Sequence, residues 1–322
     1  MTRARVSRSA PVPRARETFR AGPVPRAWEV FRTGAGFALL EHARNRLALV
    51  LVVGYIPLWL TLEHWFVSPE PARFLLRATG RTVTVDGNHL TMVSGAVNTV
   101  TLIVGFMMFM TTFKALAFDR RLALAGYSRA CLLLSKVVAM TVASALIAAY
   151  ATAVVCWYWD PVRPGLLAVG LFTAAVSYGG IGILLGAFLR SDLAGLFVII
   201  MASLLDTMLQ NPMSNTEADK DGLQLLPGYG PTQVSVAAGF TSTATSYVHL
   251  LLGPAWFLAA WALGTAAFFV RTRDHLGARG APRTASRPSP PQAPSPPRPP
   301  SPPHTPHQPL PPRSHQPAGE GT

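Results

Sequence analysis

The sequence contains little charge and little cysteine for its length. Only 13% of its 322 residues are Asp, Glu, Lys or Arg, whereas 50% are hydrophobic and the mean hydropathy is +0.31. Because a soluble domain has about 25% charged residues, this composition excludes an ordinary soluble protein and indicates an integral membrane protein. The two cysteines, Cys131 and Cys156, lie on opposite sides of the membrane in the predicted topology, so they predict no disulfide within the chain.

Recognisable chemical motifs are missing as well. The sequence has no G-x-x-x-x-G-K-[ST] phosphate loop, no H-E-x-x-H and no cluster of His and Cys residues at metal-ligand spacing. We therefore expect no catalytic residues, no metal site and no cofactor in this chain. The centres of the predicted spans are almost free of ionisable residues, and the chain shows no internal repeat, which disfavours a proton- or ion-coupled carrier.

Six apolar runs have about the length that crosses a bilayer as a helix. They are residues 47–66, 93–113, 137–157, 166–189, 193–209 and 248–270. Together they predict an all-α integral membrane protein with a transmembrane domain over residues 47–273. In the fourth run, Gly182 and Gly186 are four residues apart, a spacing that lets another helix approach closely.

The basic residues predict the orientation of these spans. Of the 28 Lys and Arg residues, 23 lie before the first run, after the sixth, or in the connections that follow the second and fourth. Since Lys and Arg beside apolar segments resist translocation, we expect these parts, including both termini, to be cytoplasmic. The formal charge of +13 is then explained by the orientation of the spans, and we expect no nucleic-acid partner. Only three of the basic residues are Lys, which is typical of GC-rich bacterial genomes and points to a bacterial cytoplasmic (inner) membrane.

The segments that flank the spans differ in composition. Residues 1–25 are rich in Arg, Pro and Ala, and residues 274–322 are rich in Pro, so both are predicted to be disordered. Residues 26–46 have apolar side chains at helical spacing, which predicts an amphipathic helix along the inner leaflet. Gly34 and Gly36 weaken that helix, and the alternative is an irregular linker.

Two of the connections on the predicted outer side have patterns of their own. Residues 81–91 alternate around Asp86 and Gly87, which favours a β-hairpin that turns at these two residues. Residues 223–247 are apolar but broken by Gly and Pro. They are too short and too interrupted to span, so we expect them to lie in the outer interface or to re-enter the membrane.

A few polar residues inside the spans are candidates for a translocation path. They are Asn98, Thr101 and Asp206. The two uncharged residues could line such a path, but bonds to a neighbouring helix or to their own backbone are the more common outcome. An ionisable residue within a span is a functional candidate by default. Asp206 lies within a turn of the outer end, however, so the favoured interpretation is that it reaches water, as is also expected for Glu63 near the outer end of the first span.

The connection between the second and third spans, residues 114–136, is a short basic elbow. Its basic residues are Lys114, Arg120, Arg121, Arg129 and Lys136, set against a single acid, Asp119. Asp119 could cap a short helix that ends at a left-handed Gly126, and Ser128 could then start the next helix. Such an elbow is either a lever on the cytoplasmic face or a charged loop that only sets the topology.

The order of these parts, over residues 26–273, resembles the permease subunit of ATP-binding-cassette exporters of the second type, the ABC-2 family. Such permeases have an inner-leaflet amphipathic helix, six spans, a basic elbow between the second and third spans, and a half-inserted segment before the last span. The elbow is similar to the family's motifs at Phe118-Asp119-Arg120-Arg121, Gly126-Tyr127-Ser128-Arg129 and Leu133-Leu134-Ser135-Lys136. It departs from them in having Gly126-Tyr127 where a Pro is common and in lacking a Glu-Arg-Glu opening.

The resemblance implies export of an unidentified substrate from the cytoplasm, driven by ATP that a separate cytoplasmic ATPase subunit hydrolyses with Mg²⁺. It also implies a dimer with a second permease copy or a paralogue. The residues to which it assigns coupling with the ATPase are Asp119, Arg120, Arg121, Gly126, Ser128 and Arg129. The alternative class is a non-transporting membrane scaffold or an immunity-type protein, which small-residue helix faces and a Pro-rich tail also fit.

Overall fold

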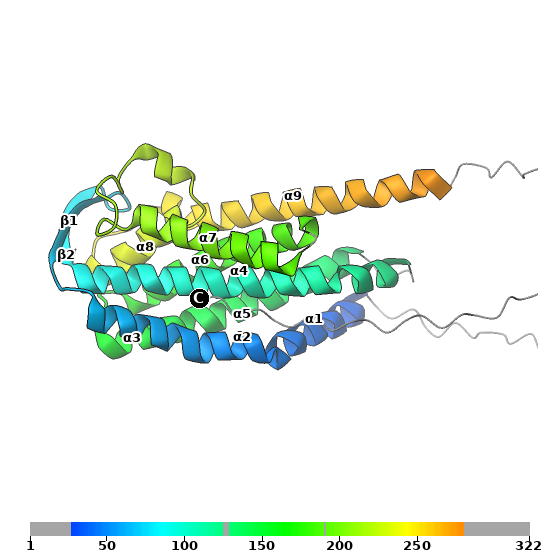
Figure 1. Ribbon diagram of the computed structural model, residues 1–322, viewed down its shortest axis with the longest axis horizontal. Helices are drawn as coiled ribbons and strands as arrows, with labels where there is room; N and C mark the ends of the chain where they lie inside the picture. Colours follow the sequence, from blue (N-terminus) through cyan, green and yellow to red (C-terminus); the bar gives the residue numbers. More distant parts are fainter. Residues whose placement is uncertain (1–26, 125–128, 190, 280–322) are drawn as a thin grey trace, which may run out of the picture. The chain divides into compact units, whose positions relative to one another are not determined.

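A computed structural model of the chain describes residues 27–124, 129–189 and 191–279. Of the two segments predicted to be disordered, residues 1–25 and 274–322, all of the first and residues 280–322 of the second lie outside the described residues. The described remainder, residues 274–279, is helical rather than disordered, because it continues the last helix of the chain. Within the described part the structure is almost entirely helical, with one two-stranded sheet at one end (Figure 1). We call this end the hairpin end, and the opposite end, where Leu124 and Arg129 lie, the elbow end.

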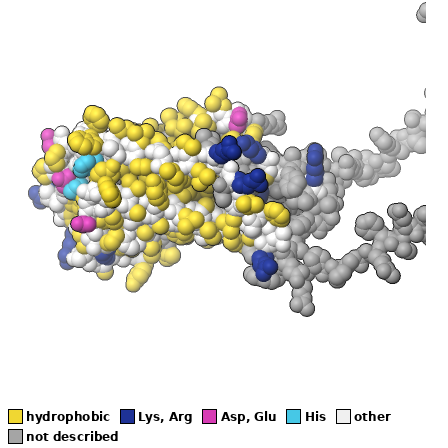
Figure 2. Space-filling model, turned by 90° about the horizontal axis from the view of Figure 1, so that it is seen from below, with side chains coloured by type: hydrophobic (Ala, Val, Ile, Leu, Met, Phe, Trp, Pro, Cys, Tyr) yellow, Lys and Arg dark blue, Asp and Glu magenta, His cyan; other side chains and the backbone are white. Residues whose placement is uncertain are grey.

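Six of the described helical segments are long and apolar enough to cross a membrane, which confirms the six predicted spans. They are Ala48–Phe66, Gly87–Ala115, Leu133–Tyr158, Pro164–Phe188, Asp192–Gln210 and Tyr247–Ala266. Large hydrophobic side chains are exposed on most of these segments, and in Figure 2 they form a broad band between the two ends of the helices. Such a band is expected of a surface that faces lipid. The chain is thus a mostly helical, multi-pass membrane protein.

The segment before the first span is a helix. It forms α1 (Ala27–Arg44), despite its two glycines, and packs against α5 (Arg129–Tyr158). The alternative of an irregular linker is therefore wrong, whereas the position of α1 along the inner leaflet remains a prediction. Packing against another helix stabilises α1 beyond its own weak propensity.

The first span contains one π-helical turn, directly before a proline. It consists of α2 (Arg46–Val50), the π-helical turn η1 (Leu51–Tyr55) and α3 (Ile56–Phe66). Pro57 has no N–H, and its ring would collide with the carbonyl four residues earlier in a regular α-helix. A wider turn placed directly before the proline relieves this clash without ending the helix.

The β-hairpin exists, but its predicted turn is wrong. Strands β1 (Pro71–Leu76) and β2 (Arg81–Asp86) pair antiparallel, so the chain turns between them, where Gly80 has a φ of 66°. Asp86 instead lies next to the start of α4 (Gly87–Leu124), and its Oδ1 accepts hydrogen bonds from the N–H of Asn88 (2.8 Å) and His89 (3.2 Å). The Asp-Gly pair therefore marks a helix N-terminus, for which an Asp before the first turn is equally suited.

Helix α4 is the most buried of the six spans and lies at the centre of the bundle. Its closest neighbour is α6 (Pro164–Phe188), and the predicted glycine face makes the contact. A Cβ on Gly182 would lie 2.2 Å from the backbone oxygen of Gly105, and one on Gly186 would lie 2.9 Å from that of Phe109. The two backbones are thus nearly in contact, as the spacing of the glycines predicts.

The segment before the last span folds back into the bundle. After α7 (Asp192–Gln210) the chain passes through the short helix η2 (Asp221–Leu225), forms α8 (Tyr229–Phe240) and continues into α9 (Tyr247–Arg279). Most of the residues of α8 are buried, and the helix packs against α6.

Two hydrogen bonds show how α8 runs along α6. The N–H of Arg163, at the start of α6, donates to Ala238 O (2.9 Å), and Ser177 Oγ donates to Pro227 O (3.1 Å). Ser177 lies about 20 Å further along α6 at 1.5 Å per residue. The N-terminus of α8 therefore lies about halfway along α6, as expected for a segment that re-enters the membrane rather than one that rests on its surface.

Candidate functional site

The described part of the chain contains a carboxylate that is hydrogen-bonded to groups from three different parts of the fold. Asp206 lies on α7, one turn before its end, and only 4% of its surface is exposed. Its Oδ2 is 2.7 Å from the hydroxyl of Tyr178 on α6 and accepts a hydrogen bond of 2.7 Å from the N–H of Gly228. Its Oδ1 accepts a hydrogen bond from Nε2 of Gln210. We call these four residues the Asp206 network.

The favoured expectation that Asp206 reaches water at the helix end is therefore wrong. The reason is a long-range one, because the chain between α7 and α9 folds back over this end of α7. Gly228 directly precedes α8, so its N–H is one of the donors that an α-helix leaves unsatisfied at its start. A negative charge is stabilised there by that N–H and by the helix dipole.

Gly228 also provides the room that the carboxylate occupies. A Cβ at this position would lie 2.5 Å from Asp206 Oδ2, too close for any other residue without a shift of the backbone or of the carboxylate. A charged side chain within a span is costly unless it is paired or hydrogen-bonded. The Asp206 network satisfies this condition, and it joins α6, α7 and α8 at a single side chain.

The other two path candidates hold α4 against α7. Asn98 Nδ2 donates to Ser203 Oγ (3.1 Å), and Thr101 Oγ1 lies 2.7 Å from the same oxygen. All three side chains are buried. The structure thus brings Asn98 and Thr101 together at Ser203, and Asp206 follows one turn later on α7. These contacts are hydrogen bonds to a neighbouring helix, one of the alternatives that the sequence left open. A role of Asn98 and Thr101 in translocation remains a prediction.

A second carboxylate, Glu63 on α3, is partly buried. Its Oε1 accepts a hydrogen bond from Trp59 Nε1 (2.9 Å), while its Oε2 is buried and has no hydrogen-bond partner among the described residues. A Cβ on Gly95 of α4 would lie 1.9 Å from this oxygen, so the carboxylate occupies the notch that the glycine leaves. Glu63 as a whole is partly buried, and its Oε2 does not reach interfacial water as the sequence led us to expect.

The elbow differs from the expected short, separately capped helix. Helix α4 continues without a break to Leu124, so Asp119, Arg120 and Arg121 belong to its last two turns, and Asp119 caps no separate helix. The side chain of Arg121 is exposed. Gly126 and Ser128 lie outside the described residues, and Arg129 is the first residue of α5.

Sequence reasoning missed three residues of the Asp206 network. Tyr178 lies beside the glycines of α6, Gln210 is the last residue of α7, and Gly228 follows Pro227. The signal that was available is the Gly- and Pro-rich run directly before α8, which indicates a special backbone there but not its partner. Among the described residues, no group of three His, Cys, Asp or Glu side chains converges as metal ligands would.

Comparison with known proteins does not identify a family for this chain. Neither the protein-family models nor the curated proteins contain a match to this chain.

Proposed function

We propose that this chain is the membrane-spanning permease subunit of an ATP-binding-cassette exporter, which moves a substrate out of the cytoplasm with ATP hydrolysed by a separate subunit. The observation that supports it best is the path of α4. This helix is unbroken from the hairpin end to Arg121 in the elbow, and on the way it contacts both α6 and α7. From Thr101 to Arg121 it extends about 30 Å at 1.5 Å per residue, long enough to transmit a displacement from one side of a bilayer to its interior.

In the proposed mechanism the elbow end faces the cytoplasm and docks on the ATPase. Closure of the ATPases pushes on the end of α4 and on the start of α5, through the residues around Arg121 and Arg129. Energetic coupling between two sites requires contacts that differ between two states. The Ser203 contacts with Asn98 and Thr101 are placed to be such contacts, because a shift of α4 must break or remake them.

The contacts of α4 define which helices move together. The close glycine contacts with α6 make these two helices a rigid pair, since neither backbone can approach or slide without a clash. Helix α7 is joined to that pair by polar contacts, and most of the side chains of α7 are not covered within the chain. Rocking of α7 and of the first span against a second permease copy would then open a path toward the hairpin end.

The proposal predicts a partner that can be captured. The tagged chain is extracted in mild detergent from its native membrane, with and without crosslinking, and the proteins that co-purify are identified by mass spectrometry. A P-loop ATPase is expected, and it is expected to be lost from the double variant Arg120→Glu with Arg121→Glu. The matched control reverses Arg73 and Arg81 on the hairpin, at the other end of the bundle, and should retain the ATPase. Absence of any ATPase from the crosslinked wild-type preparation would contradict the proposal.

A second candidate is a membrane scaffold or immunity-type protein that does not transport. It is favoured by one observation, the use of Asn98 and Thr101 in contacts between helices rather than in an open path. In that case the same double charge reversal would leave the set of co-purifying proteins unchanged.

A further inference from the structure

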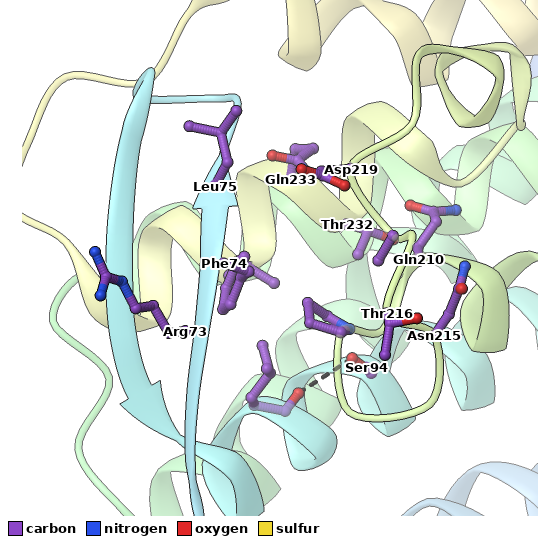
Figure 3. Close-up of a pocket in the computed structure, with 14 residues that line it drawn as sticks. Arg73, Phe74, Leu75, Ser94, Gln210, Asn215, Thr216, Asp219, Thr232 and Gln233 are labelled. Carbon is purple, nitrogen blue, oxygen red and sulfur yellow. Dashed lines mark hydrogen bonds between the residues drawn. The ribbon is translucent and has the colours of Figure 1, made fainter.

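Cavities at the two ends of the bundle differ in the charges that line them. The cavity at the hairpin end, of about 260 Å³, is lined by Arg73 and Asp219 as well as by neutral amides and hydroxyls (Figure 3), so its charge favours no class of ligand. A groove of about 460 Å³ at the elbow end has two charged lining residues, Arg44 and Lys114, and both are basic. Its volume equals that of about fifteen water molecules at roughly 30 Å³ each, which is room for a phosphate group and the carbon atoms next to it.

This groove lies at the boundary of two spans. It is formed by the residues where α1 meets α2 and by the last part of the span in α4. Arg44 lies four residues before Ala48, where the first span begins, and Lys114 lies next to Ala115, where the second span ends. The two cations are therefore at the level at which lipid head groups meet the ends of the spans. In Figure 2 basic side chains border the hydrophobic band at this end of the molecule.

The polar groups of the groove are suited to an anion. Arg44 and Lys114 are exposed, and neither forms an ion pair with another residue that the structure describes. Asn45, which lies between α1 and α2, accepts a hydrogen bond at Oδ1 from Ala48 N–H (3.3 Å), so its amide nitrogen is left to donate to another acceptor. Thr111 adds a hydroxyl, and no described residue of the lining is acidic. Such a set of donors matches a phosphate group, whose oxygens accept several hydrogen bonds from cations and amides.

Apolar side chains line the rest of the groove. Phe37 and Leu40 lie on α1, and Met110 lies on α4 one turn before Lys114. Phe37 and Leu40 are 69% and 49% exposed, so no described part of the chain covers them fully. A water-soluble phosphate would leave this apolar surface uncovered. An amphipathic anion at the end of a span would cover it and meet the cations as well.

We propose that this groove binds an anionic phospholipid from the leaflet at the elbow end. The phosphate accepts hydrogen bonds from Arg44, Lys114 and the amide nitrogen of Asn45, and an acyl chain lies on Phe37 and Leu40. A zwitterionic lipid is disfavoured, because its own cationic group would lie beside two cations with no acid to balance it. The bound lipid joins the start of the first span to the end of the second. The proposal does not rest on the permease function, since it requires only a multi-pass membrane protein.

Binding is measured by native mass spectrometry on the full chain, delipidated in detergent. The two probes are dioleoylphosphatidylglycerol, which is anionic, and dioleoylphosphatidylcholine, which has the same acyl chains and is zwitterionic. The anionic lipid is expected to bind about 25-fold more tightly, from about fivefold for each of the two cations. Equal affinities for the two lipids would overturn the proposal.

A competition experiment distinguishes a lipid from a free phosphate. Glycerol 3-phosphate, which carries the phosphate without acyl chains, is added in excess to the complex with phosphatidylglycerol. The lipid is expected to stay bound, because the apolar contacts with α1 are lost to the competitor. Displacement of the lipid would show that the groove is a site for a soluble phosphate and would overturn the proposal.

Charge-removing variants locate the head group. Arg44→Gln and Lys114→Gln should each reduce the preference for phosphatidylglycerol about fivefold, and the double variant should abolish it. The matched control is Arg46→Gln, because Arg46 is an exposed basic residue only two positions from Arg44 that does not line the groove. It should keep the preference of the wild type. An equal loss in Arg44→Gln and Arg46→Gln would show that charge attracts the lipid without a defined site, and an unchanged preference in the double variant would also overturn the proposal.

A second pair of variants locates the acyl chain. Leu40 lines the groove and Leu49 does not, and the two residues are 49% and 48% exposed, so neither substitution disturbs the core. Leu40→Ala should weaken the binding of both phospholipids, because the acyl chains that they share lose a contact, whereas Leu49→Ala should bind both as the wild type does. Affinities of Leu40→Ala equal to those of the wild type would show that the acyl chain lies elsewhere and would contradict the proposal.

Discussion

Replacement of Asp206 by Ala tests whether the Asp206 network holds α8 inside the bundle. The substitution removes the acceptor of Gly228 N–H and of Gln210 Nε2, whereas Tyr178 keeps a second acceptor, Ala202 O, at 3.1 Å from its hydroxyl. Two buried donors lose their partner at about 1–3 kcal/mol each. Hydrogen bonds between membrane helices are often worth less, on average about 0.6 kcal/mol, so the expected loss of stability is about 2–4 kcal/mol.

The assay is unfolding of the purified chain by SDS, followed by tryptophan fluorescence, for the wild type and Asp206→Ala. A matched control is Asp192→Ala, which removes the exposed carboxylate at the other end of α7 and should cost less than about 1 kcal/mol. A double-mutant cycle with Tyr178→Phe should give a coupling energy of about 0.5 kcal/mol or more, because the two side chains are in contact. A change of stability below about 0.5 kcal/mol in Asp206→Ala, with no coupling to Tyr178, would show that the Asp206 network does not hold α8 in the bundle.

Three further substitutions should change the free energy of unfolding, and the same assay measures each of them. Gly182→Val should destabilise the bundle by about 1–3 kcal/mol or more, because its side chain would meet the backbone of Gly105. Stability like that of the wild type would show that α4 and α6 can separate freely. Gly95→Ala should also destabilise, since the new methyl group displaces the carboxylate of Glu63, and restoration of stability by Glu63→Ala in the same chain would confirm that cause. Thr232→Val should raise stability by about 1 kcal/mol by removing a buried hydroxyl without a partner, and a clear loss of stability would contradict its assignment as unpartnered.

The six spans could be predicted because a bilayer imposes a length on an apolar run, and that length is visible in one stretch of sequence. The full extent of α4 could not. Its last turns, around Asp119 and Arg121, carry charges that the sequence pattern assigns to a connection, although helical hydrogen bonds continue through them. Apolar periodicity reports where a helix is buried, not where it ends.

The environment of Asp206 and Glu63 could not be predicted either, for a different reason. Whether Asp206 meets water depends on the fold of residues more than 20 positions away, since its N–H donor belongs to Gly228. Glu63 depends in the same way on Gly95 of a neighbouring helix. Position near the end of a span favours solvation, but a segment that folds back over that end overrides the local rule.

The hairpin shows that one dipeptide can occur in two structural contexts, a hairpin turn and a helix N-terminus. Asp86-Gly87 is a strong hairpin signal when apolar residues alternate on both sides, and an Asp is equally favoured before the first turn of a helix. Here the alternation continues on one side only, and the residues after Gly87 form α4. The partner strand, Pro71–Leu76, lies before the alternating segment rather than after it.

The most direct test of the central claim is site-specific photo-crosslinking from the elbow in the native membrane. A photoreactive amino acid replaces Arg121, which is exposed in the last turns of α4, and the proteins attached to it on illumination are identified by mass spectrometry. The same amino acid at Trp65, exposed near the hairpin end, is the control. If the chain is a permease, a P-loop ATPase is attached at position 121 and absent at position 65. A protein without a P-loop at position 121, or the same products at both positions, would contradict the permease function.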